Sequence, residues 1–364
     1  MSELADRLSQ RIRREGPITF HEWMKAALYD PQQGYYCRPD RERWGRAGDY
    51  RTSPERSFLF AATLARYFAR LYEKLGSPQT WTIVEAGGGE GHFAETVLQT
   101  LKSYFPAVFS VTRYLFDEAS PDSSARAEVR LAEFRNQVEF KRLDELEPLN
   151  PGIVFSNELL DAFPVHRVTM KDGQLQEFYV RLNSDGGFDW ITGTLSTERL
   201  AQRVAALRPG LGDREIVEVN LDLEDWFKMV SQRIQQGYLV TIDYGTEASD
   251  SFGATQPRRG TLRAFQRHQF ADDVLTRPGE QDITSTVDWS LVKDLGAKYG
   301  FETIAFERQD KFLLEAGLLD EMELRVNEAD QESEKQILRS LAREMILPGG
   351  MAESFQVLVQ QRDW

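Results

Sequence analysis

The 364-residue sequence predicts an α/β protein with a doubly wound, mostly parallel, Rossmann-like sheet. Three observations lead to this prediction: short apolar runs alternate with helical segments, a glycine-rich turn follows the first run, and acidic residues follow later runs. In such a sheet helices cover both faces, and a ligand binds beyond the carboxyl ends of the strands. We therefore expect the functional residues in the loops that follow the strands.

The alternation of elements runs from residue 81 to residue 243. An amphipathic helix precedes it, because Phe58, Leu59 and Ala62 begin an apolar pattern with helical spacing. Upstream, Thr52-Ser53-Pro54-Glu55 has the capping hydroxyl, early proline and acidic residue of a helix start. We expect strands at Trp81–Glu85, Val111–Phe116, Val138–Phe140, Ile153–Ser156 and Gly237–Asp243, and helices at Phe93–Ser103, Ala125–Phe134 and Leu223–Gln235.

Two segments interrupt this pattern and are expected to lie over the carboxyl edge of the sheet. Residues 164–216 contain two apolar runs around Lys171-Asp172-Gly173, which is typical of a hairpin. Residues 245–290 are rich in Gly, Arg and Thr and form a substrate-side insertion. The expected organisation is an N-terminal helical region with a lid loop at 1–75, the two insertions, and a core at 76–163, 217–244 and 291–364, in which 320–344 form a charged helical region.

The charge balance bears on the partners of the protein. The net charge of -14 argues against nucleic-acid binding, which depends on neutralising phosphates. A basic protein or peptide would be attracted to such a surface, although solubility alone explains the charge as well. No apolar run approaches the roughly 20 residues of a membrane helix, so we expect no membrane insertion.

The cysteine and histidine content bears on the compartment and on metals. Cys37 is the single cysteine, and the N-terminus has no apolar stretch of signal-peptide type. We therefore expect a reducing, cytoplasmic location. The four histidines show no zinc-ligand spacing, and we expect no metal site.

The glycine-rich turn follows the first expected strand in the stretch Ile83-Val84-Glu85-Ala86-Gly87-Gly88-Gly89-Glu90-Gly91. The register Gly87-x-Gly89-x-Gly91 is one residue shorter than the dinucleotide motif G-x-G-x-x-G. Glu85 and Glu90 would repel a pyrophosphate, whereas a sulfonium nucleoside without phosphate suits them. We expect S-adenosylmethionine, with the glycines beside its adenosyl and amino-acid parts and Glu85 on its ammonium. A tight turn with solvated carboxylates is the simpler alternative.

Acidic residues after the next two strands fit the same cofactor. Glu118, in Asp117-Glu118 after the second strand, is placed to accept the ribose hydroxyls. Asp144 follows the third strand, where an adenine amino group is often bound. A glycine turn together with these acids predicts a nucleoside site more specifically than the turn alone.

The loop after the fourth strand is expected to contact the methyl acceptor. It contains Asn157, Glu158 and Asp161 in S-N-E-L-L-D-A-F-P. A guanidinium is always protonated and a poor nucleophile, so an arginine acceptor needs carboxylates that orient it and disperse its charge. Glu158 is the first candidate and Asp161 the second. The alternative is that Glu158 caps the following helix.

The sequence resembles the MidA-type methyltransferases, which include the arginine methyltransferase assembly factor of respiratory complex I. The resemblance extends from Gly16 to about residue 317. Its motifs are Tyr29-Asp30-Pro31…Gly34-Tyr35-Tyr36, Gly48-Asp49-Tyr50-Arg51-Thr52-Ser53-Pro54-Glu55, the glycine turn, Ser156–Pro164, Ile242-Asp243-Tyr244-Gly245, Gly260–Phe265 with His268, and Pro278–Thr284 with Val287-Asp288-Trp289.

This resemblance implies a class I methyltransferase that uses S-adenosylmethionine and acts on arginine in a partner protein like a complex I subunit. It adds Thr52 and Ser53 to the expected cofactor site, because the Gly48–Glu55 loop lines that site in the family. The sequence departs from the family pattern in three places. Gly88 stands where proline is usual, Thr286 lies where histidine often follows, and the segment Gly350…Phe355 is spaced differently.

Three residues of the second insertion have two interpretations each. His268 either relays a proton at the substrate mouth or is a structural, hydrogen-bonded histidine. Asp282 and Asp288 either contact substrate or cap the helix that starts near Trp289.

Two other classes of function remain open at this stage. The first is a non-catalytic assembly chaperone that keeps the methyltransferase fold. The second is an NAD-dependent oxidoreductase, which the glycine register disfavours. The sequence does not decide the identity of the partner, the degree of methylation or the oligomeric state, for which a homodimer is one option.

Overall fold

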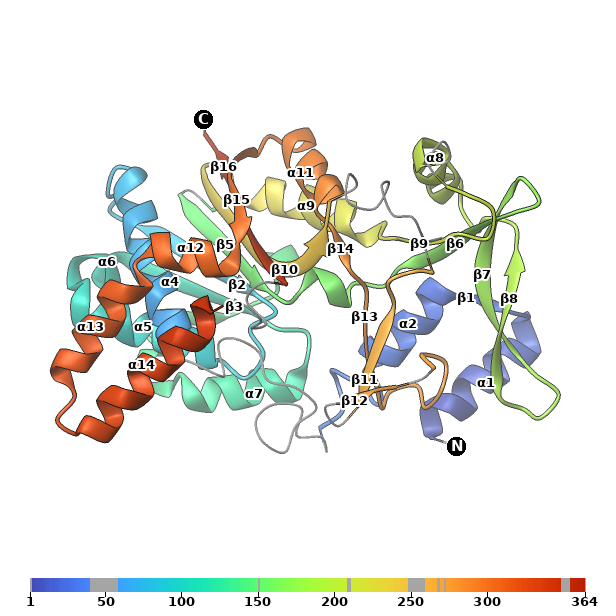
Figure 1. Ribbon diagram of the computed structural model, residues 1–364, viewed down its shortest axis with the longest axis horizontal. Coiled ribbons are helices and arrows are strands. Elements are labelled where there is room, and N and C mark those ends of the chain that lie inside the picture. Colours follow the sequence, from blue (N-terminus) through green and yellow to red (C-terminus); the bar gives the residue numbers. More distant parts are fainter. Residues whose placement is uncertain are drawn as a thin grey trace.

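A mostly parallel sheet forms the centre of the computed structural model, which describes residues 2–39, 58–149, 151–207, 211–247, 259–266, 269–271, 273–347 and 354–363. The strand order is β15-β16-β10-β5-β2-β3-β4, and β14 pairs with β10 (Figure 1). Only β16 is antiparallel to its neighbours β10 and β15 among these described strands. The predicted doubly wound α/β class is confirmed. The strands are β2 (Trp81–Ala86), β3 (Thr112–Asp117), β4 (Val138–Phe140), β5 (Gly152–Asn157), β10 (Gly237–Thr246), β14 (Val287–Asp288), β15 (Glu302–Arg308) and β16 (Phe355–Arg362).

Helices cover both faces of this sheet because successive strand residues point to opposite sides. In β5, Ile153 and Phe155 belong to one hydrophobic cluster and Val154 to the other. The first cluster packs against α4 (Phe58–Lys74), α5 (His92–Tyr104), α6 (Pro106–Val111), α7 (Pro121–Arg130), α12 (Gln309–Ala316), α13 (Leu318–Glu328) and α14 (Glu332–Ile346). The second packs against α9 (Asp222–Arg233) and α11 (Trp289–Lys298).

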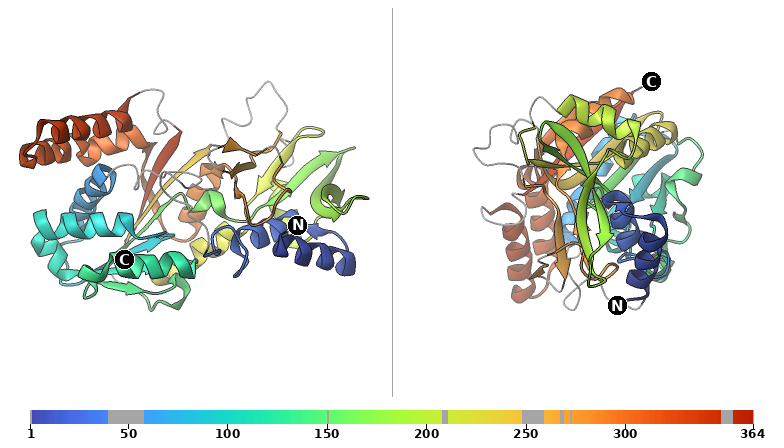
Figure 2. Two further views of the ribbon diagram at one scale, coloured as in Figure 1. Left: turned by 90° about the horizontal axis from the view of Figure 1, so that it is seen from below. Right: turned by 90° about the vertical axis from the view of Figure 1, so that its right-hand side faces the viewer.

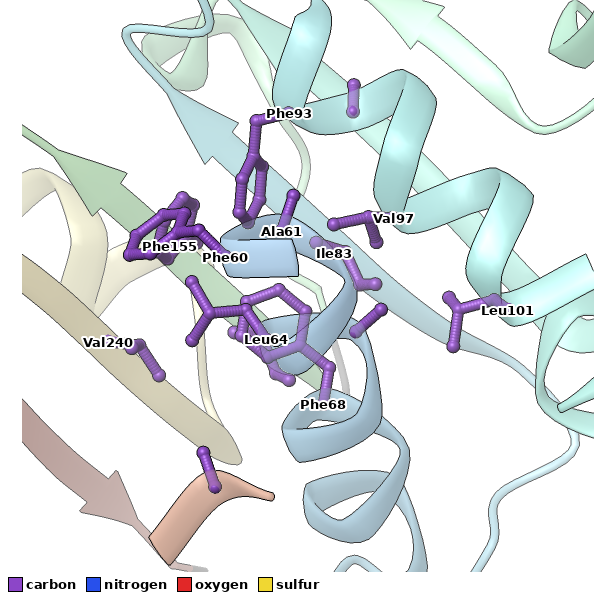
Figure 3. Packing of buried hydrophobic residues seen from close by; sticks show 14 of the residues in the cluster. Phe60, Ala61, Leu64, Phe68, Ile83, Phe93, Val97, Leu101, Phe155 and Val240 are labelled. Atoms are coloured by element: carbon purple, nitrogen blue, oxygen red, sulfur yellow. The ribbon is translucent and has the colours of Figure 1, made fainter. Parts of the chain in front are cut away.

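Three phenylalanines join the first helical layer to the sheet (Figure 3). The ring of Phe93 on α5 stacks on that of Phe155 on β5, with centroids 4.3 Å apart. Phe68 on α4 meets the Phe155 ring edge-on at 5.6 Å. These contacts fix the start of α5, and with it the end of the glycine turn, relative to the end of β5.

A second, smaller part of the molecule is built from the N-terminal helices and the two expected insertions. Figures 1 and 2 show it at the end of the molecule away from α13 and α14. Its larger sheet has the order β1-β7-β6-β9, with β8 on β7, and its smaller sheet has the order β12-β11-β13. Its elements are α1 (Glu3–Glu15), β1 (Ile18–Thr19), α2 (Phe20–Tyr29), β6 (His166–Lys171), β7 (Gln174–Leu182), β8 (Phe188–Gly193), α8 (Glu198–Leu207), β9 (Ile216–Val219), β11 (Arg263–Gln266), β12 (Gln269–Phe270) and β13 (Asp282–Thr284).

The predicted elements mostly agree with this structure. The hairpin is confirmed, since Lys171 pairs with Gln174 at the end of β6 and β7. The N-terminal helical region expected within residues 1–75 is interrupted by a short strand, because Gly16 ends α1 with a φ of 87° and Ile18 pairs with Val180. The helix predicted from Ala125 starts earlier, at Pro121, because Ser120 caps it. The helix start predicted at Thr52–Glu55 lies outside the described residues.

Some regions that the sequence suggests are separate share elements in the structure. The region 1–75 supplies α1 and α2 to the smaller part and α4 to the main sheet. Strand β9 pairs with β6 across the expected boundary at residue 216. The boundaries themselves stay predictions. Within the ranges given above, no helix is long and apolar enough to cross a membrane.

The buried phenylalanine contacts predict the effect of a core substitution. Phe68→Ala should lower the free energy of unfolding by about 3–5 kcal/mol, because a fully buried ring leaves a cavity. Phe58→Ala on the same helix should cost less than about 1 kcal/mol, since this ring is 40% exposed. Urea unfolding measures both variants. Equal losses would contradict the packing described for α4.

Candidate active site

A large cavity of about 1450 Å³ lies at the carboxyl edge of the main sheet. It is lined by the loops after β2, β3 and β5, by the end of β10, and by residues of α2, α9, β11, β13 and β16. Nine carboxyl side chains and three Lys or Arg side chains are among the described residues that line it. This balance favours a cationic ligand over a phosphate-bearing one.

The glycine turn adopts a backbone that side chains rarely allow. Gly87, Gly89 and Gly91 have φ values of 75°, 58° and 81°. Gly91 begins α5, and a Cβ there would lie 3.1 Å from the Cβ of Ala127. The first two glycines line the cavity, so their missing side chains leave the backbone open to a ligand.

Glu85 is the last residue but one of β2 and lines this cavity. It is 4% exposed, and the Tyr114 hydroxyl donates a hydrogen bond of 2.7 Å to its Oε2. Burial raises the pKa of Glu85 to about 8, although the Tyr114 hydrogen bond opposes the shift. A cation beside Glu85 would favour the ionised carboxylate.

The acids after β3 differ in their surroundings. Glu118 lines the cavity and ties the glycine turn to β3, because its Oε2 accepts the Gly89 N–H at 2.8 Å. Asp117 also lines the cavity and was missed as a candidate by the sequence reasoning. Burial raises the pKa of Asp117 to about 6, and Arg142, 2.8 Å away, opposes the shift. Asp144 is not among the described lining residues, but its charge adds to the raised pKa of Asp117.

The loop after β5 brings Asn157, Glu158 and Asp161 to the same cavity. Glu158 has a φ of 50°, which strains a residue with a side chain. Asn157 Nδ2 donates a hydrogen bond of 3.1 Å to Glu158 Oε1. Glu158 is not the cap of the next turn, η3 (Leu160–Ala162), because Asp243 on β10 accepts the N–H of Leu160.

Tyrosines and an arginine surround Asp161. The Tyr244 hydroxyl donates a hydrogen bond to the Asp161 carboxylate, and the Arg263 guanidinium lies 5.1 Å from the centre of the Tyr244 ring. Burial raises the pKa of Asp161 to about 6. Tyr29 lies nearby, where its hydroxyl donates to the Ala162 carbonyl at 3.0 Å. The sequence reasoning gave none of these neighbours a role, although Tyr244 and Arg263 stand in motifs of the resemblance.

The remaining candidates fall into two groups. Asp282 lines the cavity and accepts the Tyr36 hydroxyl at 2.6 Å, whereas Asp288 caps α11 by accepting the Leu291 N–H. The capping alternative is therefore correct for Asp288. His268, Thr52 and Ser53 lie outside the described residues. Among the residues that the structure describes, no cluster of His, Cys, Asp or Glu suits a metal ion.

The described part of the cavity fits S-adenosylmethionine by the chemistry of its groups. The glycine turn offers backbone without side chains, Glu85 a carboxylate for an ammonium, and Asp117 and Glu118 acceptors for hydroxyls. Carboxylates at both ends of the turn suit a ligand that carries a sulfonium and no phosphate.

Fold and site together define a class I methyltransferase that uses S-adenosylmethionine. The model of a family of S-adenosyl-L-methionine-dependent methyltransferases matches residues 63–307, and the chain belongs to this family. A crystal structure of a protein from Burkholderia thailandensis bound to S-adenosyl-homocysteine is similar to it. The two are 27% identical, with a TM-score of 0.85 and coverage of 99% of this chain and 92% of the other.

The relatives of this chain include two animal proteins. The mitochondrial protein arginine methyltransferase NDUFAF7 homolog of Drosophila melanogaster is 29% identical over 82% of this chain and 70% of its own length. The mitochondrial protein arginine methyltransferase NDUFAF7 of Homo sapiens is 24% identical over 96% of this chain and 81% of its own length. The family suggested by the sequence motifs is therefore confirmed.

The strained backbone at Glu158 gives a first prediction for the site. Glu158→Gly and Glu158→Ala both remove the carboxylate, but only glycine relieves the positive φ. Glu158→Gly should therefore be more stable than Glu158→Ala by roughly 1 kcal/mol in urea unfolding. Equal stabilities of the two variants would show that the backbone at this position relaxes freely.

The raised pKa of Glu85 gives a second prediction. Below about pH 8 the free protein holds a proton on Glu85, and an ammonium ligand must displace it. The affinity for S-adenosyl-homocysteine should therefore rise with pH between about 6 and 8, by at most about tenfold per unit, and then level off. Calorimetric titration across this range measures it. Glu85→Gln should remove most of the dependence; an unchanged profile in this variant would rule out Glu85 as the group responsible.

Proposed function

We propose that this enzyme methylates the side chain of arginine in a partner protein. The observation that carries the proposal is the pair Glu158 and Asp161, two carboxyl groups of one loop in a cavity that already carries an excess of acids. A guanidinium stays charged and forms paired hydrogen bonds to carboxylates, so these two carboxyl groups suit it as a binding site. The names of the animal relatives as protein arginine methyltransferases support the same substrate.

The reaction needs orientation and removal of one proton. S-adenosylmethionine supplies a methyl group on a sulfonium; the N–C bond to a guanidinium nitrogen forms as the C–S bond breaks, and that nitrogen loses a proton. Glu158, positioned by Asn157, orients the guanidinium. Asp161 accepts the proton, because burial brings its pKa to about 6, closer to neutral pH than that of an ordinary aspartate.

Several expectations from the sequence belong to this proposal and stay predictions. His268 would serve as a relay, and Thr52 and Ser53 would contact the cofactor. A cytoplasmic location rests on the single cysteine, Cys37, which is buried and reduced, whereas the relatives named above are mitochondrial. Cell fractionation tests the location, and sedimentation tests the homodimer.

The arginine proposal is testable without knowing the partner. The probe is a 5′-thioadenosine that carries a three-carbon arm ending in guanidine, compared with the same compound ending in a methyl group. The guanidine compound should bind at least about tenfold more tightly, because charge-assisted hydrogen bonds to Glu158 and Asp161 add to the adenosine contacts. Calorimetric titration gives both affinities.

The matched variants are Glu158→Gln and Glu90→Gln. We call the tighter binding of the guanidine compound, relative to the methyl compound, the guanidine advantage. Glu158→Gln should lose this advantage and keep its affinity for S-adenosyl-homocysteine. Glu90→Gln changes a carboxylate on the glycine turn and should keep the advantage. No advantage in the wild-type protein would refute the arginine acceptor. Transfer of labelled methyl groups to arginine peptides, with lysine peptides as control, separates the enzyme from a non-catalytic assembly chaperone.

A further inference from the structure

The loop that carries Glu158 and Asp161 is held by strand β10, which follows it by some 80 residues in the sequence. The Glu158 N–H donates to the Ile242 carbonyl at 2.9 Å. Asp243, the next residue on β10, is completely buried. Its Oδ2 accepts the N–H of Leu160 at 2.9 Å and that of Asp161 at 3.3 Å. Strand β10 therefore binds this loop through its backbone and through a side chain.

Asp243 replaces a cap that the loop itself does not provide. Leu159 precedes the short turn η3, and its side chain forms no capping hydrogen bond. The first N–H groups of such a turn need an acceptor, and a carboxylate is among the best. Asp243 is not among the described residues that line the cavity, so it acts through the loop rather than by touching a ligand.

Other contacts hold the loop from the far side. The Ser285 N–H donates to the Asp161 carbonyl at 2.9 Å, and the Tyr29 hydroxyl donates to the Ala162 carbonyl. Neither contact reaches the amides between the two acidic side chains. Asp243 bonds to these amides and so sets the spacing between Glu158 and Asp161, including the positive φ of Glu158.

We propose that Asp243 is the positioning residue of the acceptor site, which fixes Glu158 and Asp161 in the geometry that receives a guanidinium. This inference rests on the proposed arginine acceptor for its functional meaning, and on the hydrogen bonds of the Leu160 and Asp161 amides for its physical basis.

The same arrangement couples the charges of the two aspartates. Burial and the neighbouring Asp161 hold the pKa of Asp243 well above its usual range, and Glu158 adds to this shift. Tyr244 and Arg263 face Asp161 and favour its ionised form. Asp161 therefore ionises first and its charge keeps the proton on Asp243, so removing the Asp161 carboxyl group should move the titration of Asp243 to lower pH.

The test compares Asp243→Asn and Asp243→Ala with Thr241→Val. Thr241 lies two residues away on the same face of β10, is 1% exposed, and its hydroxyl has no hydrogen-bond partner among the described groups, so Thr241→Val is a matched buried control. Both Asp243 variants should lose the guanidine advantage of the thioadenosine probe by roughly tenfold or more, with the larger loss in Asp243→Ala. Their affinity for S-adenosyl-homocysteine should stay within about threefold of the wild type.

A pH series separates positioning from a general loss of structure. In the wild-type protein the guanidine advantage should fall as the pH drops through about 6, where Asp161 takes up a proton. In Asp243→Asn the residual advantage should be smaller at every pH but fall through the same pH range, because a protonated Asp243 adds no charge beside Asp161. Thr241→Val should follow the wild type in both respects. A full guanidine advantage in Asp243→Asn would overturn the inference.

Failure of the arginine proposal would be recognised separately. If the wild-type protein shows no guanidine advantage, the acceptor assignment is wrong, and amide hydrogen exchange of residues 158–162 decides the positioning role. Exchange should be faster in Asp243→Asn than in Thr241→Val. Equal exchange in the two variants would overturn the role of Asp243 as well.

Discussion

The parallel register of β2, β5 and β10 is the constraint on which the site depends. Glu85 pairs with Phe155 across β2 and β5, and Asn157 pairs with Ile242 across β5 and β10. The three strands therefore end at the same edge of the sheet, and the polar residues at or after their ends, which are far apart in the sequence, lie close together there. Because parallel strands need long crossovers, helices cover both faces and leave this edge as the place where polar groups can gather.

Burying several carboxyl groups at this edge has an electrostatic cost, and this cost explains the preference for a cationic ligand. Glu85, Asp161 and Asp243 are buried, and each has a raised pKa because its ionised form loses water. Hydroxyls and backbone N–H groups offset part of this cost, as Tyr114 does for Glu85. A ligand that brings positive charge offsets more of it. The cofactor and the proposed arginine acceptor, both cationic, should therefore stabilise the fold that binds them.

The sequence predicts the parts of this arrangement that depend on local chemistry. The strand at Val138–Phe140 and the hairpin at Lys171-Asp172-Gly173 follow from apolar periodicity and turn residues. The pairing of β16 with β10 joins Phe355 to Tyr244 across more than 100 residues, and no local pattern specifies it. The same limit applies to Asp243, whose hydrogen bonds cross from β10 to the loop after β5.

A tertiary contact explains why this sequence has glycine at position 88, where it departs from the family pattern. The family pattern that the sequence resembles has proline there, and its absence is a departure within the expected cofactor loop. A Cβ on Gly88, however, would lie 2.3 Å from Cε2 of Phe116, which is buried on β3 and packs on Phe140. The bulky ring of Phe116 therefore excludes any side chain at Gly88. Glycine at this position reflects the packing of β3 beneath the turn, and the positive φ of Gly87 and Gly89 leaves the side that faces the cavity open.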